Sequence, residues 1–209
     1  EPDHTPTRIQ LEKFLDLARR FPHITTLHAA NSAATLQFPE THLNMVRVGI
    51  SIYGFYPSNA VRKSVSLRPV LSLKTRVIRL YSIKEGEGLS YGLTWVAPRD
   101  SLIALIPFGY GDGLPRLLSN KGEVLIGGRR APIRGVVCMD QSIIDVTGIP
   151  DVRVGDEVTI IGRQGSEEIT AGDIAELTGT IHYEVVTRLS GVLPRLYLRT
   201  SQPETCRAV

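Results

Sequence analysis

The chain has 209 residues, of which 42% are hydrophobic and 22% charged, and its formal net charge is +3. This composition allows a buried core and excludes disorder, and the scattered Lys and Arg residues argue against a nucleic-acid-binding surface. Two cysteines, Cys138 and Cys206, are too few for a disulfide framework and favour a reducing compartment. No run approaches the roughly 18 apolar residues of a membrane span, and no signal peptide is recognisable, so we expect a cytoplasmic protein without membrane contact.

The N-terminal quarter of the chain predicts alternating helices and strands. Thr7 and Gln10 fit a capping box at the start of a helix. The expected elements are a helix near 7–20, a strand over 24–28, a helix over 32–37, a strand near 45–48 and a short helix or turn in "GISIYG". This order is typical of the end of a βα-repeated fold, so we expect the sequence to begin inside a larger fold.

The rest of the chain predicts a mostly-β domain. Residues 57–68 are polar and indicate a linker. From 69 to 198, short β-branched runs separated by Gly, Pro and Asp favour a β-barrel or sandwich. One helix is expected to interrupt the strands over 170–178, with a capping box that begins at Thr170. Residues 199–209 indicate a frayed tail.

Two strand-end loops in the N-terminal region carry a possible anion site. In "HAANSAATL", Asn31 and Ser32 fall where a helix begins, and in "RVGISIYG" the N–H groups of Gly49 and Ile50 open a short helix. Free N–H groups at helix starts bind anions, and TIM barrels often hold phosphate after their last strands. A plain N-cap and a tight turn account for the same residues, and Arg47 on spacing alone is an ordinary surface arginine. The spacing leaves both interpretations open.

Eight stretches, taken in order, carry a more specific signal: "HAANSAATL", "MVRVGISIYG", "LRPVLSLKTRVI", "GEGLSYGLTWVA", "IPFGYGDGLPR", "RGVVCMDQSIIDVT", "GDEVTIIG" and "TIHYEVVTRLSGVLPRLY". They resemble the C-terminal part of bacterial alanine racemases, over roughly residues 8–198. The resemblance implies an α/β plus β fold, in which residues 1–56 are the last units of a TIM barrel that binds pyridoxal 5′-phosphate and 69–198 a barrel-like β-domain. It also implies a homodimer that serves bacterial wall synthesis.

The same resemblance implies interconversion of L- and D-alanine by two-base proton transfer on an aldimine of the cofactor. One base removes the Cα proton and another returns a proton on the opposite face. In the family one base is the lysine that binds the cofactor, and the other is a tyrosine that matches Tyr91 of "GLSYG". A phenol, with a usual pKa of about 10, needs a cationic or hydrogen-bonding neighbour to act as a base at neutral pH. That neighbour is a histidine in the family's N-terminal half. Taken alone, Tyr91 is also explained as a strand residue with its hydroxyl in water.

The remaining site residues are likewise implied by the resemblance. Arg47 matches the arginine that faces the pyridine nitrogen and keeps it unprotonated, because a guanidinium does not readily lose its proton. His28 matches the histidine bonded to that arginine, although a satisfied strand-end histidine remains an alternative. The phosphate contacts match a hydroxyl and two N–H groups, and further residues lie beside them: Ser32, Gly49, Ile50, Asn31 and Tyr53. Tyr53 is also explained by packing under the barrel rim.

In the β-domain, Met139 of "CMDQ" matches the position whose backbone N–H meets the substrate carboxylate. Cys138 is expected beside the pocket and not as a nucleophile, because no His or Asn partner is visible. Tyr110 and Asp112 of "GYGDG" resemble entrance residues. This glycine-rich piece lacks the strand and helix context of a nucleotide-binding loop, and no metal site is indicated.

Two departures from the family matter. We expect the barrel half with the cofactor-binding lysine to be absent, because none of the following lysines sits in a matching motif: Lys13, Lys63, Lys74, Lys84 and Lys121. Gly191 stands where some members have a phosphate-contacting tyrosine. We therefore expect the chain alone to be inactive. A racemase of broader specificity, acting on serine or larger amino acids, and a non-enzymatic β-barrel interaction module remain alternatives.

Overall fold

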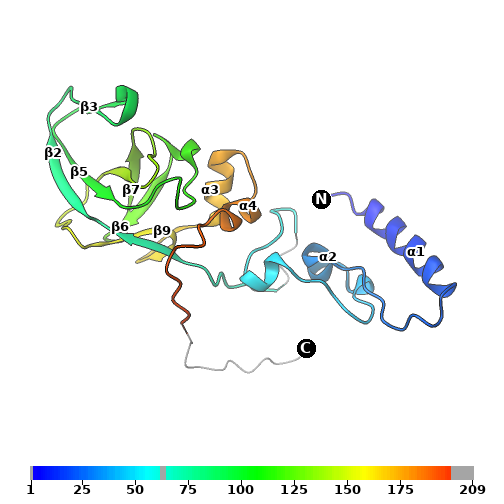
Figure 1. Ribbon diagram of the computed structural model, residues 1–209. Coiled ribbons are helices and arrows are strands. Elements are labelled where there is room, and N and C mark those ends of the chain that lie inside the picture. Colours follow the sequence, from blue (N-terminus) through cyan, green and yellow to red (C-terminus); the bar gives the residue numbers. More distant parts are fainter. Residues whose placement is uncertain (1, 62–64, 199–209) are drawn as a thin grey trace. The chain divides into compact units, whose positions relative to one another are not determined.

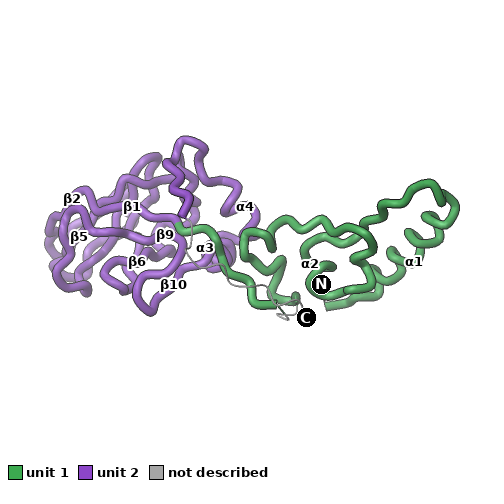
Figure 2. The backbone as a smooth tube through the Cα atoms, turned by 90° about the horizontal axis from the view of Figure 1, so that it is seen from below, with its two compact units in different colours: residues 1–72 green, residues 73–209 purple. Residues whose placement is uncertain are grey.

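The computed structural model describes residues 2–61 and 65–198. The chain divides into two compact units, residues 1–72 and residues 73–209, which are coloured separately in Figure 2. The predicted tail, 199–209, lies outside the described residues, as do residues 62–64 of the predicted linker. In the described part of that linker, no helix or strand is formed. The two units are described one at a time below.

The first helix of unit 1, α1 (Thr5–Arg19), starts earlier than the sequence predicts. Its N-cap is His4, which makes no capping hydrogen bond with its side chain, and the capping box expected at Thr7 is therefore wrong. The physical reason is local: Pro6 favours the first helical turn, and the carboxylate of Asp3 accepts a hydrogen bond from the Thr5 N–H at 2.9 Å. Thr7 is thus already inside the helix.

Two short helices of unit 1 match the prediction, α2 (Ser32–Gln37) and η2 (Ile50–Tyr53), but its strands do not. A third short helix, η1 (Pro39–Thr41), was not predicted. The strands predicted over 24–28 and near 45–48 are wrong, because the two segments share only one parallel bridge, between His28 and Met45. A parallel strand is stabilised by neighbours on both sides and by covering helices, and the described residues of unit 1 do not provide them.

Unit 2 is mostly β, as predicted, and its strands pair antiparallel. The main sheet contains β1 (Leu73–Arg76), β2 (Arg79–Ile83), β5 (Ser101–Ile106), β6 (Glu123–Ile126), β7 (Arg129–Arg134), β8 (Ser142–Asp145), β9 (Glu157–Gln164) and β10 (Glu167–Ile169). Its order is β1-β9-β6-β7-β8-β5-β2, with β10 paired to β9. A separate pair, β3 (Gly88–Leu89) and β4 (Trp95–Val96), encloses the short helix η3 (Tyr91–Leu93).

The main sheet closes on itself into a barrel-like form, which Figure 1 shows as a sheet curled around its own interior. Its two ends, β1 and β2, are consecutive in the chain and are separated only by Val77 and Ile78. The Val77 N–H donates to Asp156 at 3.0 Å and the Ile78 N–H to Leu105 at 2.9 Å, so one bent segment pairs with β9 on one side and β5 on the other. Closure of this kind removes the exposed edges of a sheet.

The interior of unit 2 is apolar and tightly covered. Its largest fully buried side chains come from five strands and the segments between them, and they include Ile103, Ile133, Ile144 and Ile160. All of these large, fully buried side chains lie in unit 2. A second cluster forms where Ile83, Leu89, Ala97 and Ile103 pack with Trp95. The second cluster joins the β3–β4 pair to the main sheet.

Two helices cover part of unit 2. The helix predicted over 170–178 is confirmed as α3 (Ala171–Thr178), and its capping box is complete, with the Thr170 side chain and Asp173 each accepting the other's N–H. The sequence interpretation missed a second helix, α4 (His182–Thr187), which packs on α3. Helix η4 (Arg116–Leu118) lies in the connection between β5 and β6.

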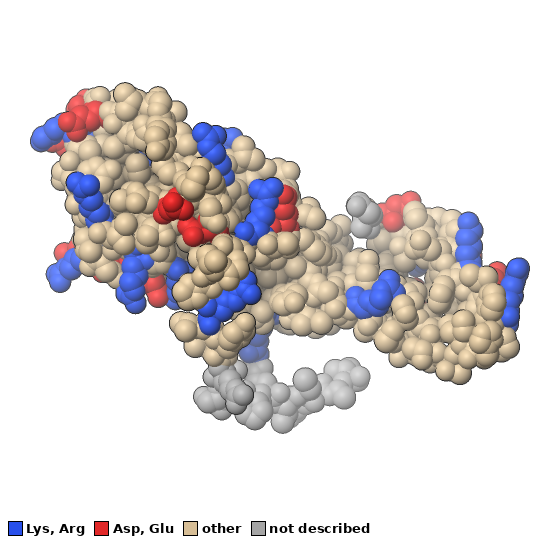
Figure 3. Space-filling view, viewed as in Figure 1, with Lys and Arg blue, Asp and Glu red and all other residues tan. Residues whose placement is uncertain are grey.

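The surface and helices of the described residues add two observations. On the face drawn in Figure 3, the Lys and Arg side chains of unit 2 are interspersed with Asp and Glu. Within the described ranges, none of the helices combines the length and apolar character that a bilayer crossing requires, and no cluster of three metal-ligating side chains is found.

Candidate functional site

In unit 1, the predicted His28 and Arg47 lie in direct contact. A terminal guanidinium nitrogen of Arg47, Nη1, is 2.8 Å from Nδ1 of His28 and 3.4 Å from the His28 carbonyl oxygen. Arg47 is always a donor, so Nδ1 of His28 accepts the bond and any proton of the neutral ring is on Nε2. The Arg47 N–H also donates to the Ala30 carbonyl at 2.8 Å. Two adjacent chain segments thus hold this guanidinium at one place.

The predicted phosphate residues also meet in unit 1. The Gly49 N–H donates to Oγ of Ser32 at 2.9 Å, which leaves the hydroxyl proton of Ser32 available to another acceptor. Ile50, the first residue of η2, is buried, and its N–H precedes the hydrogen bonds of that helix. The Asn31 side chain accepts the Ala34 N–H at 3.0 Å as the cap of α2. Asn31 therefore acts here as a helix cap.

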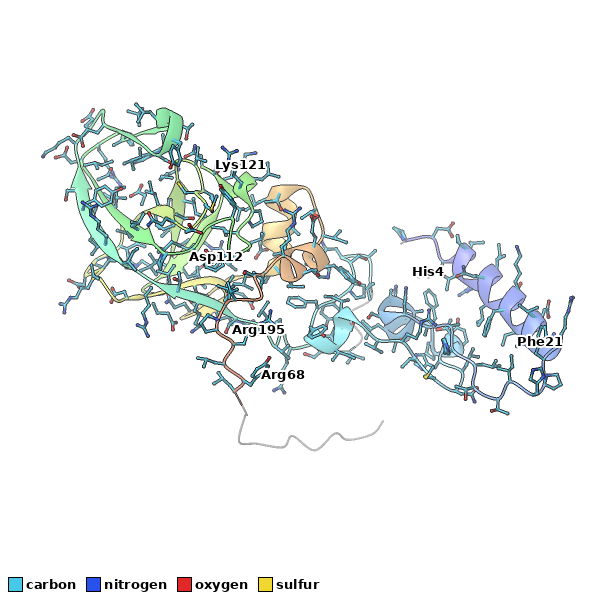
Figure 4. The ribbon with its side chains drawn as sticks, viewed as in Figure 1. His4, Phe21, Arg68, Asp112, Lys121 and Arg195 are labelled. Atoms are coloured by element: carbon cyan, nitrogen blue, oxygen red, sulfur yellow. The ribbon has the colours of Figure 1, made fainter. Side chains whose placement is uncertain are left out.

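A pocket of about 780 Å³ lies within unit 1, and Ser32, Gly49 and Ile50 are not among its lining residues. Its lining combines α1 and α2 with three of the predicted site residues, His28, Asn31 and Arg47. His4, labelled in Figure 4, also lines it and packs edge-on against Phe38, with the ring centroids 4.8 Å apart. Tyr53 is not among the lining residues and is 57% exposed. A volume of this size is typical of a small-molecule site.

In unit 2, Tyr91 projects from a turn with unusual backbone angles. We call residues 90–94 the tyrosine turn. Tyr91 begins η3 and is 75% exposed, so it does not pack as an ordinary strand residue. Ser90 has φ 64° and ψ −179°, and Leu93 has φ 47°. Such angles in residues other than glycine cost free energy and persist only where surrounding contacts impose them, which is common at functional sites.

The predicted substrate contact, Met139, lies in a loop of unit 2 held by the "GYGDG" segment. We call residues 135–139 the methionine loop. The Met139 carbonyl accepts the Gly111 N–H at 2.8 Å, while the Met139 N–H makes no hydrogen bond within the described part of the chain. Cys138 accepts the Tyr110 N–H at 3.0 Å. A Cβ atom at Gly109 would lie 2.2 Å from the Cys138 carbonyl oxygen, so only glycine permits this close approach.

Asp112 holds the glycine-rich segment in shape. Its carboxylate accepts the Gly109 N–H at 2.9 Å, and its carbonyl accepts the Ser190 N–H at 3.0 Å (Figure 4 labels Asp112). Cys138 has no His within hydrogen-bond distance among the described residues, and its thiol contacts the Val136 carbonyl. Asp112 therefore stabilises the glycine-rich segment that holds the methionine loop. Cys138 is a structural residue of the methionine loop.

The structure thus brings the predicted residues together in two sets, one in each unit. His28, Asn31, Ser32, Arg47, Gly49 and Ile50 share unit 1, and Tyr91 and Met139 belong to unit 2. Sequence reasoning missed Ser90 and Asn120, whose side chains link the tyrosine turn to the methionine loop. The only sequence signal for Asn120 is its place in "SNKG", a composition typical of turns.

The fold has two parts: a portion of a barrel that carries a paired arginine and histidine, and a curled antiparallel β-domain that follows it. Together these parts define a class of enzyme fold. The alanine racemase N-terminal domain model matches residues 1–57, and the alanine racemase C-terminal domain model matches residues 70–197. The chain belongs to the alanine racemase family. Its N-terminal part is a short portion of the family's barrel, and the rest is the mostly antiparallel C-terminal domain.

Named relatives agree with this assignment. Alanine racemase of Halothermothrix orenii is 55% identical over 170 residues, which are 81% of this chain and 45% of the relative. Alanine racemase 1 of Clostridium acetobutylicum is 44% identical over 201 residues, 94% of this chain and 52% of the relative. The chain spans about half the length of the curated relatives it matches.

Solved structures show the same likeness. The crystal structure of alanine racemase from Bacillus anthracis with bound L-Ala-P superposes with a TM-score of 0.87 and 39% identity, covering 96% of this chain and 53% of that one. Alanine racemase from Bartonella henselae, with covalently bound pyridoxal phosphate, gives a TM-score of 0.83 at 30% identity and covers 95% of this chain and 54% of that one. The family is one of pyridoxal-phosphate-dependent enzymes.

Proposed function

We propose that this chain is the later half of an alanine racemase, an isomerase that interconverts L- and D-alanine with pyridoxal 5′-phosphate. The observation that carries the proposal is the 2.8 Å contact between Arg47 and His28, because it fixes a permanent cation between the two segments joined by the His28–Met45 bridge. A guanidinium at that place suits a ring nitrogen that must stay unprotonated. The names of the relatives support alanine as the substrate.

The residues of unit 1 fit this cofactor. The hydroxyl proton of Ser32 and the N–H of Ile50 are available to phosphate oxygens, and the Gly49 N–H orients the Ser32 hydroxyl that would donate to them. We assign Arg47 to the pyridine nitrogen and His28 to holding Arg47. Asn31 and Tyr53 belong to the same site as neighbours: Asn31 fixes the start of α2, and Tyr53 lies at the end of η2.

The chain's own residues then divide the work of proton transfer. When bound, pyridoxal phosphate supplies the electron withdrawal that makes the Cα proton of alanine removable. The Tyr91 phenolic oxygen takes the Cα proton of L-alanine on one face and returns a proton on that face in the reverse direction. The unpaired Met139 N–H donates to the substrate carboxylate. Because Arg47 stays protonated, it limits the negative charge carried into the ring and so disfavours transamination.

The proposal includes an assembly. We propose a cytoplasmic homodimer in which Tyr91 serves a cofactor bound to the other subunit. Tyr91 is 75% exposed, which agrees with a group that acts outside its own unit. We assign no described lysine to the opposite face of the substrate, so a chain that supplies the other half of the barrel must provide the second base. The chain alone should not racemise alanine.

The test joins residues 1–209 to the preceding half of the Halothermothrix orenii relative and measures D-alanine formed from L-alanine. The fusion should racemise alanine, and the 209-residue chain should not. In the fusion, Tyr91→Phe should lower kcat by a factor of about 100 or more, in the range lost with one general acid–base group. Tyr197→Phe is the control, because the Tyr197 phenol is also highly exposed, at 88%, and has no role in the proposed reaction. An inactive fusion contradicts the proposal and favours an interaction module. An active isolated chain contradicts the claim that the second base comes from the other half of the barrel.

A broader amino-acid racemase is a second candidate, because Gly191 stands where some family members have a phosphate-contacting tyrosine. Gly191 is exposed and an added Cβ meets no atom within 4 Å, so no described side chain of unit 2 takes the place of that tyrosine. We propose that its loss widens the site enough to admit serine and larger amino acids. The ratio of kcat/KM for serine to that for alanine decides between the two specificities. Gly191→Tyr in the fusion should lower this ratio if the pocket is wider, and an unchanged ratio excludes the role.

A further inference from the structure

Three consecutive backbone N–H groups of the methionine loop donate to side chains from two other loops. The Gly135 N–H donates to Oδ1 of Asn120 at 2.6 Å, the Val136 N–H to Oγ of Ser90 at 3.0 Å, and the Val137 N–H to Oγ of Ser119 at 3.0 Å. The Ser90 hydroxyl also donates back to the Val136 carbonyl at 3.0 Å. These bonds fix the methionine loop as far as Val137, two residues before Met139.

Asn120 is the member that reaches both functional loops. Its Oδ1 accepts from Gly135, which sets the orientation of the amide, and its Nδ2 then faces Thr94, 3.3 Å from both the carbonyl oxygen and Oγ1. Thr94 ends the tyrosine turn. Asn120 itself has φ 57°, a left-handed conformation that asparagine adopts more readily than most residues. Both its backbone and its side chain therefore suit this position.

The tyrosine turn needs such support. Ser90, directly before Tyr91, lies in a backbone region that is essentially confined to glycine, and Leu93 is left-handed. Without outside contacts the turn would relax toward ordinary angles and move the Tyr91 ring. Ser90 is bonded to Val136 on one side of Tyr91, and Thr94 is bonded to Asn120 on the other. One end of the turn is thus hydrogen-bonded to the methionine loop directly, and the other end is linked to it through Asn120.

We propose that Asn120 is a positioning residue for Tyr91: it joins the tyrosine turn to the methionine loop and so fixes the phenol relative to the Met139 N–H. This inference rests on the proposed function, which gives Tyr91 and Met139 their roles. The chemistry needs such a link, because a base must stay within hydrogen-bond reach of the proton it removes while the carboxylate is held. Asn120 contacts neither the substrate nor the cofactor in this scheme.

The first experiment uses the 209-residue chain and its single tryptophan. Trp95 follows Thr94 and packs in the Leu89 cluster, so acrylamide quenching of its fluorescence reports release of the tyrosine turn. Asn120→Gly removes the side chain but keeps the left-handed backbone, and it should raise the quenching constant. Asn120→Asp keeps an acceptor for Gly135 but loses the donor to Thr94, and it should raise the constant as well. Quenching in both variants equal to that of the unaltered chain overturns the link.

The matched control for this experiment is Lys121→Ala. Lys121 is the next residue, is exposed, and its side chain makes no hydrogen bond or ion pair with the rest of the described chain (Figure 4 labels it). Its quenching constant should equal that of the unaltered chain. An equal rise in the control and in Asn120→Gly would show a general loosening of the loop and would overturn the specific role of Asn120.

The second experiment separates positioning from a loss of folded enzyme. In the active fusion, Asn120→Gly should lower kcat roughly tenfold to a hundredfold, as expected when a reacting group is misplaced by about 1 Å. It should also raise the primary isotope effect for Cα-deuterated L-alanine, whose proton goes to Tyr91, more than that for D-alanine. Isotope effects do not depend on the amount of active enzyme.

The failure of this inference differs from that of the proposed function. A fusion that forms no D-alanine overturns the proposed function, whatever Trp95 reports. An active fusion in which Asn120→Gly leaves both isotope effects unchanged, or raises them equally, overturns the positioning role. Partial recovery of the L-alanine isotope effect in Asn120→Asp supports it, because that variant retains the bond to Gly135.

Discussion

The two units of this chain differ in how far each completes its own structure. Unit 2 pairs β1 and β2 with opposite ends of one sheet and buries an apolar interior. Among the described residues of unit 1 there is a single parallel bridge, and α1 has no buried residue. An antiparallel sheet that closes on itself satisfies its own hydrogen bonds, whereas parallel barrel strands depend on neighbours. The β-domain therefore satisfies the strand pairing of its own sheet, whereas the described barrel portion lacks neighbours for its parallel segments.

Hydrogen exchange provides the largest test of this difference. We expect amides of β5 and β8 to exchange only through global unfolding, and those of residues 24–28 and 45–48 to exchange through local opening. The protection factors should differ by roughly 1,000-fold or more. Equal protection in the two units, measured by mass spectrometry on the same sample, would contradict the comparison.

Two isoleucines, one in each unit, test the same contrast through packing. Ile144 is fully buried, and Ile9 in α1 is 46% exposed. Ile144→Ala should lower the free energy of unfolding of unit 2 by about 2–5 kcal/mol, because it leaves a cavity in a closed core. Ile9→Ala should change the free energy of unfolding of unit 1 by less than about 0.5 kcal/mol. Urea denaturation measures both free energies of unfolding. A large effect of Ile9→Ala would show that α1 packs into a stable core in unit 1, which contradicts the contrast between the units.

Local signals in the sequence predicted the starts of two helices correctly. Asn31 and Thr170 each cap the helix that follows, because a cap depends on residues three positions away. The expected strand over 24–28 failed because its hydrogen bonds must come from distant segments. The pairing that closes the sheet, β1 with β9 and β2 with β5, is equally distant in sequence and was not predicted.

Two threonines test how far a capping pattern in the sequence predicts the start of a helix. Thr170 and Thr7 have the same sequence pattern, but only Thr170 accepts a capping hydrogen bond. Thr170→Ala should therefore lower the stability of unit 2 by about 0.5–2 kcal/mol. Thr7→Ala should leave thermal unfolding and helix content almost unchanged. If both variants lose helical circular dichroism equally, α1 begins at Thr7 after all.

The smallest expected effect is a pH dependence in α4. Burial lowers the pKa of His182 below its usual 6.5, so the folded state binds this proton less readily than the unfolded state. Stability is fully present above pH 6.5 and should fall as the pH decreases below that value. His182→Gln cannot take up the proton and should reduce this fall. The melting temperature of unit 2 at pH 7.5 and pH 5.5 measures it, and an identical fall in both proteins would exclude His182.

The residues of the candidate site were predictable from the sequence only where they belong to a motif that resembles the family. The resemblance of "GLSYG" and "CMDQ" singled out Tyr91 and Met139, and "HAANSAATL" singled out the residues around His28. The backbone angles of Ser90 and the contact of Asn120 with Gly135 were not predictable, because both arise from loops brought together by folding. Side chains that act through a third loop leave no spacing pattern in the sequence.

The most direct test of the account is whether Tyr91 removes the proton from L-alanine. In the active fusion carrying Tyr91→Phe, we measure loss of the Cα proton from each alanine enantiomer in deuterated water by NMR. We expect proton release from L-alanine to be abolished, while the Cα proton of D-alanine still exchanges with solvent through the base on the opposite face. Release from L-alanine at the rate of the unaltered fusion would contradict the assignment of Tyr91 as the base.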